Sequence, residues 1–195
     1  MNLVEHVQQK FAQSIKTQME AESLLAEPIA RAASLIVQRL LEGSKILCCG
    51  NGAGAADAQR FSSDMLNRFE RERPGLPALA LTTDTSTLTA IASDYDYDEV
   101  FAKQLHAIGH PGDLLLVISS HDDAENLCAA VAAAHEREMF VVMLTANQPG
   151  RLADHLREHD VEIRVPTEHA STAREVHVVA LNSLCDLIDL QLLGS

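Results

Sequence analysis

The sequence has no tryptophan, and aromatic residues make up only 4% of it. The core must therefore consist of aliphatic side chains, which are plentiful because apolar residues form 47% of the chain. Positive charge is also scarce, since 15 Lys and Arg stand against 28 Asp and Glu, for a net charge of −13. Nucleic acids and anionic membranes bind cationic surfaces, so the sequence predicts no direct binding to either.

Long apolar runs and paired cysteine motifs are missing as well. No uninterrupted apolar run reaches 18 residues, and the opening MNLVEHVQQKF lacks the apolar segment of a secretory signal, so we expect no membrane span and no export. The cysteines have no CxxC spacing and lie within apolar segments, which predicts buried free thiols in a cytoplasmic protein. They are Cys48, Cys49, Cys128 and Cys185.

The chain also lacks repeats and low-complexity linkers, and its 195 residues predict one domain with a sizeable core. Residues 1–43 are expected to form two leading helices, 3–24 and 27–43, of which the second is amphipathic and ends at Gly43. This helix and a final helix, 172–193, are apolar enough to need partners beyond one sheet face. We therefore expect the leading helices to form the core of an oligomer.

Residues 44–195 alternate short apolar runs with segments long enough for helices, which is typical of a doubly wound parallel sheet. The apolar runs lack polar alternation, which indicates strands buried on both faces. We predict a three-layer α/β sandwich with five parallel strands. The expected strands are 46–49, 79–81, 114–118, 140–144 and 161–165, and the expected helices between them are 55–70, 98–109, 123–137 and 149–157.

The most informative segment is KILCCGNGAGAADAQRF, residues 45–61. A short apolar run ends in a glycine-rich turn that leads into an alanine-rich helical segment. A strand, a glycine turn and a helix N-terminus together aim backbone N–H groups at an anion, usually a phosphate. Two interpretations stay open: the turn binds a ligand, or it only lets the helix pack closely on the sheet.

Four stretches together resemble the sugar-isomerase (SIS) domain family and, within it, the group of sedoheptulose-7-phosphate isomerases and DnaA initiator-associating proteins. They are GNG after the first strand, AQRFSSDMLNRFERERPGLPALAL, GDLLLVIS, and REVH with LCDLID in the last helix, and the similarity covers essentially the whole chain. The resemblance implies a homotetramer. It also implies proton transfer between C1 and C2 of a ketose phosphate by a carboxylate and a histidine, with zinc in many members.

The positions that the resemblance assigns to the zinc site hold different residues in this chain. His and Glu, four apart in the family, are Arg60 and Asp64 here, while Gln and His, eight apart, are Arg174 and Asn182. Arginine keeps its proton near neutral pH and asparagine does not titrate, so we expect no zinc and no cofactor. Arg60 and Asp64 form either a surface ion pair or, with Arg174 and Glu175, a salt network.

The implied phosphate loops also differ from the family pattern. The first loop lacks its serine, and the second carries Asp122 and Asp123, which either repel a phosphate or cap the next helix. Seven positions still match residues near the family's ligand, and we expect them to bind it if any sugar derivative binds. They are Gly50, Asn51, Gly52, Arg68, Asp94, Ser119 and Ser120.

From these departures we expect a non-catalytic SIS-fold adaptor that resembles the DnaA initiator-associating proteins, and therefore a chain that is not an enzyme. Leu192 and Leu193 would dock on DnaA or pack within the tetramer. The alternative is an active sedoheptulose-7-phosphate isomerase with Asp64 as base and His177 as acid. A third hypothesis is a sensor for a neutral or cationic sugar derivative, built on Asp94 and the two aspartates of the second loop.

Overall fold

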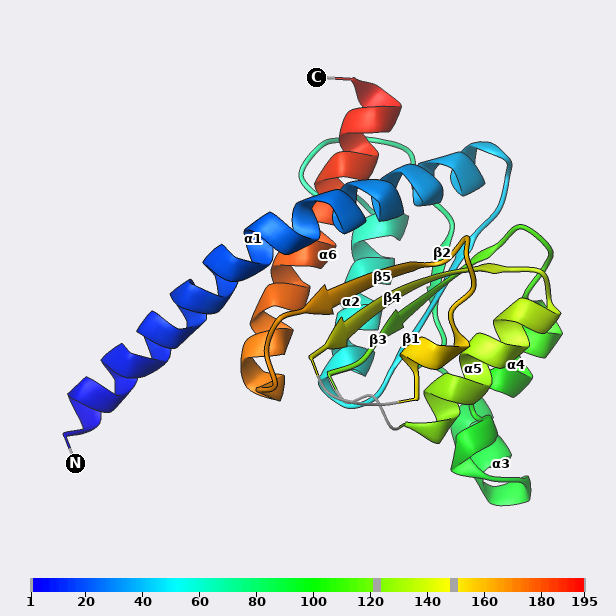
Figure 1. Ribbon diagram of the computed structural model, residues 1–195. Helices are drawn as coiled ribbons and strands as arrows, with labels where there is room; N and C mark the ends of the chain where they lie inside the picture. Colours follow the sequence, from blue (N-terminus) through cyan, green and yellow to red (C-terminus); the bar gives the residue numbers. More distant parts are fainter. Residues whose placement is uncertain (1, 121–123, 148–150, 195) are drawn as a thin grey trace.

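The computed structural model describes residues 2–120, 124–147 and 151–194 and has an α/β architecture around one parallel sheet (Figure 1). Its five strands follow the order β2-β1-β3-β4-β5, and every neighbouring pair is parallel. Strands β1 and β3 are buried along their whole length, because both of their faces are apolar. The predicted five-stranded, doubly wound fold is confirmed. The strands are β1 (Ile46–Gly50), β2 (Ala78–Ala80), β3 (Leu114–Ile118), β4 (Phe140–Ala146) and β5 (Val161–Val165).

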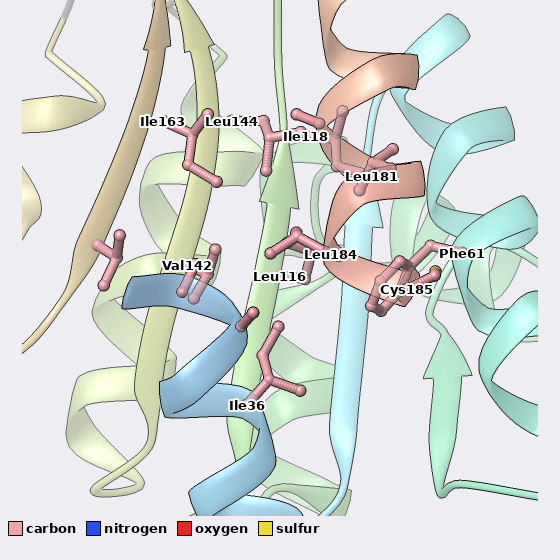
Figure 2. Close-up of a cluster of buried hydrophobic side chains, with 14 of the residues drawn as sticks. Ile36, Phe61, Leu116, Ile118, Val142, Leu144, Ile163, Leu181, Leu184 and Cys185 are labelled. Carbon is pink, nitrogen blue, oxygen red and sulfur yellow. The ribbon is translucent and has the colours of Figure 1, made fainter. Parts of the chain in front are cut away.

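Helices cover both faces of the sheet and separate the core into two layers. On one face lie α1 (Leu3–Leu41), α2 (Ala53–Leu66) and α6 (Ala170–Leu193), and on the other lie α3 (Thr85–Asp94), α4 (Ala102–Ile108) and α5 (Glu125–Glu136). Figure 2 shows the first layer, in which Ile36 and Leu184 lie near Leu116 of β3 and Phe61 lies beside Cys185 of α6. Such burial removes about 1.5–3 kcal/mol of unfavourable hydration per large apolar side chain.

The N-terminal segment forms one helix instead of the two that the sequence predicted. Helix α1 runs without interruption through Pro28, and its buried face continues on both sides of it, from Leu25 to Ala32. A proline removes only one backbone donor, and packing of the apolar face against α6 and β5 keeps the helix going. The boundary expected near residue 25 was therefore wrong.

Three further segments differ from the prediction. Helix α3 was not predicted, although Asp84 caps it by accepting hydrogen bonds from the backbone N–H groups of Ser86 and Thr87, both at 3.1 Å. The expected helix at 98–109 is divided into a 3₁₀ turn, η1 (Tyr97–Glu99), and α4. Within the described part of 149–157, only the 3₁₀ turn η2 (Ala153–His155) forms.

Helix α6 is the one described helix that is long and apolar enough to cross a membrane by length and composition, with a mean hydropathy of 1.5 over its best window. The sequence analysis predicted a helix at 172–193 but counted only uninterrupted apolar runs, so it did not register this hydropathy. The core helix of a soluble domain passes the same test, and α6 packs against α1 and the sheet with Ala180, Leu184 and Ile188 buried. It also buries the carboxylate of Asp189. We interpret α6 as the central core helix of this domain.

Candidate functional site

The loops that follow β1 and β3 meet where the strand order of the sheet reverses. The chain passes from β1 to β2 on one side of it and then crosses back to β3 on its other side, so β1 and β3 are neighbours at the reversal. In open parallel sheets such a switch point, at the carboxyl ends of the strands, is where ligands bind. The loop that follows β2 lies beside them, because Gln59 Nε2 of α2 donates to Thr82 Oγ1 of that loop at 3.2 Å.

The glycine turn after β1 has a geometry that other residues cannot adopt. Gly52 has φ of +55°, which is the left-handed region. A Cβ atom on Gly54 would lie 2.3 Å from the carbonyl oxygen of Ile118, at the end of β3. No side chain caps the first turn of α2, although Gly54 N–H donates to the Asn51 carbonyl at 2.9 Å, so the positive end of the helix faces the loop region.

Asn51 is fixed by two residues that the sequence analysis missed. Its side-chain amide and that of Asn126 donate to each other, at 2.8 and 3.0 Å, and the Tyr97 hydroxyl donates to Asn51 Oδ1 at 3.3 Å. Asn126 is 2% exposed. A polar side chain in the first turn of an otherwise apolar helix was the available signal, because a buried amide requires partners.

The structure brings some of the predicted ligand-binding residues together and separates others. Ser119, which is buried, and Ser120 follow β3 directly, beside the turn formed by Gly50, Asn51 and Gly52. Arg68 lies beyond the far end of α2, is exposed, and pairs with Glu72 at 3.5 Å, so it does not reach the turn of its own chain. Asp94 ends α3, three residues before Tyr97. The predicted repulsive pair, Asp122 and Asp123, lies outside the described residues.

A second polar cluster lies between α2 and α6. Arg60 Nη1 donates to Asn182 Oδ1 at 2.7 Å. Two carboxylates flank the same guanidinium, with Asp57 Oδ1 3.8 Å from Nε and Asp64 Oδ2 3.9 Å from Nη1. Both distances exceed a hydrogen bond, so the carboxylates balance the charge of Arg60 without occupying its donors.

Asp64 has the environment of a general base. Partial burial raises the pKa of its carboxyl, against the opposing effects of Arg60 and Arg73. Its backbone is held by Arg73, whose Nη2 donates to the Asp64 carbonyl at 2.9 Å and whose Nη1 donates to the Met65 carbonyl at 2.8 Å. Arg73 also forms an ion pair with Asp189 of α6, and both side chains are at most 2% exposed. Arg73 therefore fixes the end of α2 to α6.

His177 is fully buried on α6, close to the same cluster. Its Nε2 lies 2.9 Å from the Thr145 carbonyl oxygen, which makes Nε2 the protonated nitrogen, and Nδ1 has no partner among the described residues. Burial lowers the pKa of His177, although the bond to Thr145 and the charge of Asp57 oppose this effect. The ring is thus neutral near pH 7, with an unused acceptor that faces the interior.

The predicted salt network around residue 174 does not form. Arg174 is exposed, and its Nε donates to the Ala170 carbonyl of its own helix at 3.0 Å. Glu175 instead accepts a hydrogen bond from Ser14 of α1. Only the pair of Arg60 and Asp64 from that hypothesis is present, at a distance that indicates a loose ion pair.

These residues do not fit a zinc ion. Of the four positions that the resemblance assigns to the metal, only Asp64 offers an anionic ligand, and the amide oxygen of Asn182 is already bound by Arg60. Zinc sites in proteins use at least three Cys, His or carboxylate ligands, and no such group occurs among the described residues.

The two leucines predicted to bind a partner differ in environment. Leu192 is partly buried and packs against the core, whereas Leu193 is 41% exposed at the end of α6. Docking of DnaA on them stays a prediction.

Comparison with known proteins identifies close relatives over the whole chain. The family model of the SIS domain matches residues 9–146. A phosphoheptose isomerase from Alkalilimnicola ehrlichii is 55% identical over 100% of this chain and 99% of its own. The solved phosphoheptose isomerase GmhA of Neisseria gonorrhoeae is 45% identical, with a TM-score of 0.91 over 96% of this chain and 99% of that one. A phosphoheptose isomerase from Francisella tularensis is 41% identical, with a TM-score of 0.94 over 97% and 99%.

These findings contradict the expectation of a non-catalytic adaptor that is not an enzyme. Four relatives are 50–55% identical to this chain over at least 96% of its length, and each is named a phosphoheptose isomerase. This finding favours the alternative that the sequence analysis left open. The error came from giving four substituted positions, such as Arg60 and Asn182, more weight than the similarity of the whole chain.

Proposed function

Because the chain belongs to the SIS domain family, we propose that it is a phosphoheptose isomerase, which interconverts sedoheptulose 7-phosphate and the corresponding aldose phosphate. The observation that carries this proposal is 55% identity to an isomerase over the full length of both chains. The glycine turn at the switch point of the sheet supports it, because that turn suits the phosphate group of such a substrate.

The length of α2 supports a long sugar. Ala55 in the first turn and Asp64 near the end are nine residues apart, which is about 14 Å of helix. An extended seven-carbon sugar that places its phosphate on the turn reaches toward Asp64 with C1, whereas a three-carbon sugar does not. Asp64 then takes the proton from C1, and its raised pKa makes it a stronger base than an ordinary aspartate. His177, predicted as the acid, is neutral and buried, and its Nε2–H is held by the Thr145 carbonyl, so the proposed step assigns no proton transfer to it.

The proposal is tested by incubating the purified full chain with sedoheptulose 7-phosphate and following aldose formation by NMR. We expect turnover, and we expect Asp64→Asn to lose it because the amide cannot accept the proton. A five-carbon ketose phosphate should react more slowly than the seven-carbon one. The absence of turnover, or equal rates for Asp64→Asn and the unchanged chain, would refute the proposal.

A homotetramer is proposed for the same protein. Apolar side chains along the N-terminal part of α1 are exposed, and a groove of about 500 Å³ between α1 and α6 is lined by Leu25, Ile29, Val179 and Leu187, among others. Other copies of the chain would cover these surfaces. The exposed large apolar residues in this N-terminal part of α1 are Leu3, Val4, Val7, Phe11, Ile15, Met19 and Leu24.

Light scattering should give a mass four times the 21.2 kDa of one chain. Replacing Phe11 and Ile15 by Asp should reduce that mass. We also propose a cytoplasmic location, since all four cysteines are free and buried, as a reducing compartment allows.

A further inference from the structure

The cluster between α2 and α6 contains a hydrogen-bond donor that nothing in the described part of the chain satisfies. Arg60 Nη2 is shielded from solvent and has no acceptor there. The other terminal nitrogen, Nη1, already donates to Asn182 Oδ1 at 2.7 Å. Buried donors normally have partners, so an unsatisfied one beside a polar cluster points to an acceptor that a ligand supplies.

Neighbouring residues position the guanidinium of Arg60 but leave some of its N–H donors without an acceptor. Asp57 and Asp64 lie 3.8 and 3.9 Å from its nitrogens, which is beyond hydrogen-bond distance. The bond to Asn182 fixes the plane of the group, and an arginine cannot lose its proton in this pH range. A fixed positive charge therefore stands next to the candidate base, at a position where the family resemblance implies a ligand of zinc.

We infer that the guanidinium of Arg60, and not a metal ion, binds the oxygen atoms at C1 and C2 of the sugar and stabilises the negative charge that develops there. This inference rests on the proposed isomerase function and assigns Arg60 as a catalytic residue of that site. The disagreement between the residues at positions 60 and 182 and the ligands of a zinc site is its second support, because the reaction still requires a positive charge near the carbonyl oxygen.

The chemical step balances without a co-reactant. Asp64 takes a proton from C1, the electron pair of that C–H bond forms the C1=C2 double bond, and the carbonyl pair moves onto O2, where Arg60 stabilises it. Asp64 then returns the proton to C2 and the proton on O1 moves to O2, so that C1 becomes the aldehyde. No atom is gained or lost, and Asp64 ends as the carboxylate with which it began.

The first experiment compares metal-free and zinc-loaded protein. The full chain is dialysed against a chelator, and both the turnover of sedoheptulose 7-phosphate and its dissociation constant by calorimetry are measured with and without added Zn²⁺. We expect the metal-free protein to bind and turn over the sugar fully. Turnover or binding that disappears with the chelator and returns with Zn²⁺ would overturn the inference.

The second experiment removes the charge of Arg60. Arg60→Gln should lower kcat about a hundredfold or more, the usual loss when one donor to a developing oxyanion is removed, and should weaken binding about tenfold to a hundredfold. Arg60→Lys keeps the charge but loses the planar fork, so we expect an intermediate effect. The matched control is Arg157→Gln, because Arg157 is exposed in the turn before β5, at the opposite edge of the sheet.

Circular dichroism shows whether each variant folds. A further variant, Asn182→Ala, keeps the charge of Arg60 and removes only the acceptor for its Nη1. We expect it to lower kcat less than Arg60→Gln does, with no response to Zn²⁺. An Arg60→Gln protein that binds and reacts like Arg157→Gln overturns the inference, as does an unchanged chain that does not bind the sugar. A chain that binds the sugar through Arg60 without turnover removes the proposed function and the catalytic role of Arg60, and leaves only the binding contact of its guanidinium.

Discussion

Replacing Arg73 by Met should destabilise the fold by about 3–5 kcal/mol, because breaking a buried ion pair from one side leaves an uncompensated charge. The side chains of Arg73 and Asp189 are 1% and 2% exposed, so water cannot screen the carboxylate that remains. Asp189 Oδ2 has no hydrogen-bond partner among the described residues, so the carboxylate depends on the bond that Arg73 Nε donates to Oδ1. The variant also loses the bonds from Arg73 to the carbonyls of Asp64 and Met65.

The size of the loss should depend on which partner is removed. Asp189→Asn keeps an acceptor for Nε and loses only the charge, so we expect a smaller cost of about 1.5–3 kcal/mol. The double variant Arg73→Met with Asp189→Leu should be more stable than the sum of the single effects predicts, because it leaves no unpaired charge. Arg71→Met is the control: Arg71 is exposed and, among the described residues, donates a hydrogen bond to the Gly194 carbonyl alone, at 2.6 Å, so its loss should cost less than about 0.5 kcal/mol.

Urea unfolding followed by circular dichroism gives these differences. All variants are compared at one protein concentration, because the proposed assembly would shift the apparent stability. The reasoning fails if Arg73→Met costs no more than Arg71→Met, or if the effects of the two single substitutions simply add.

Three further predictions concern the site. Gly54→Ala places a Cβ 2.3 Å from a carbonyl oxygen of β3, so we expect it to lower the thermal midpoint and to weaken phosphate binding measured by calorimetry; an unchanged midpoint would contradict the geometry. Burial lowers the pKa of His177 from 6.5 in the folded state. As the pH drops below about 6.5, the imidazole is therefore protonated more readily in the unfolded chain than in the folded one, and the free energy of unfolding should fall. In His177→Gln that part of the pH dependence should be absent from urea titrations, and its persistence would assign it to other groups. Converting Arg60 and Asn182 to His places two imidazoles beside Asp64, and this variant should bind Zn²⁺ in a dye-competition titration; equally weak binding by the unchanged chain and the variant would show that the two helices do not present the ligands together.

The sheet was predictable from the sequence because buried parallel strands leave a clear signal. Runs such as LLLVI at 114–118 have no polar alternation, and the glycine turn after β1 marks the change from strand to helix. Helix α3 was not predicted because its sequence, TSTLTAIASD, has low helix propensity. Its stability comes from the Asp84 cap and from the packing of Leu88 and Ile91. The break expected in α1 was wrong because the tertiary contacts of the helix outweigh one proline.

The residues of the site were predictable in kind but not in arrangement. Sequence spacing placed Arg60 and Asp64 on one helical face, and the structure has both near Asn182. Spacing does not determine rotamers, however, and Arg174 turns back onto its own helix instead of joining them. Asn126 and Tyr97 were missed because their role depends on contact with Asn51 across the switch point, which local sequence does not encode.

Helix α1 also has a consequence for handling the protein in dilute solution. Its 39 residues span about 58 Å, and its first half extends beyond the rest of the domain (Figure 1). An isolated helical arm of this kind is marginal in water, so its order should depend on the further copies that would cover it in the proposed tetramer. Dilution below the assembly constant should therefore fray residues 3–16 and open them to proteases, while the sheet remains folded.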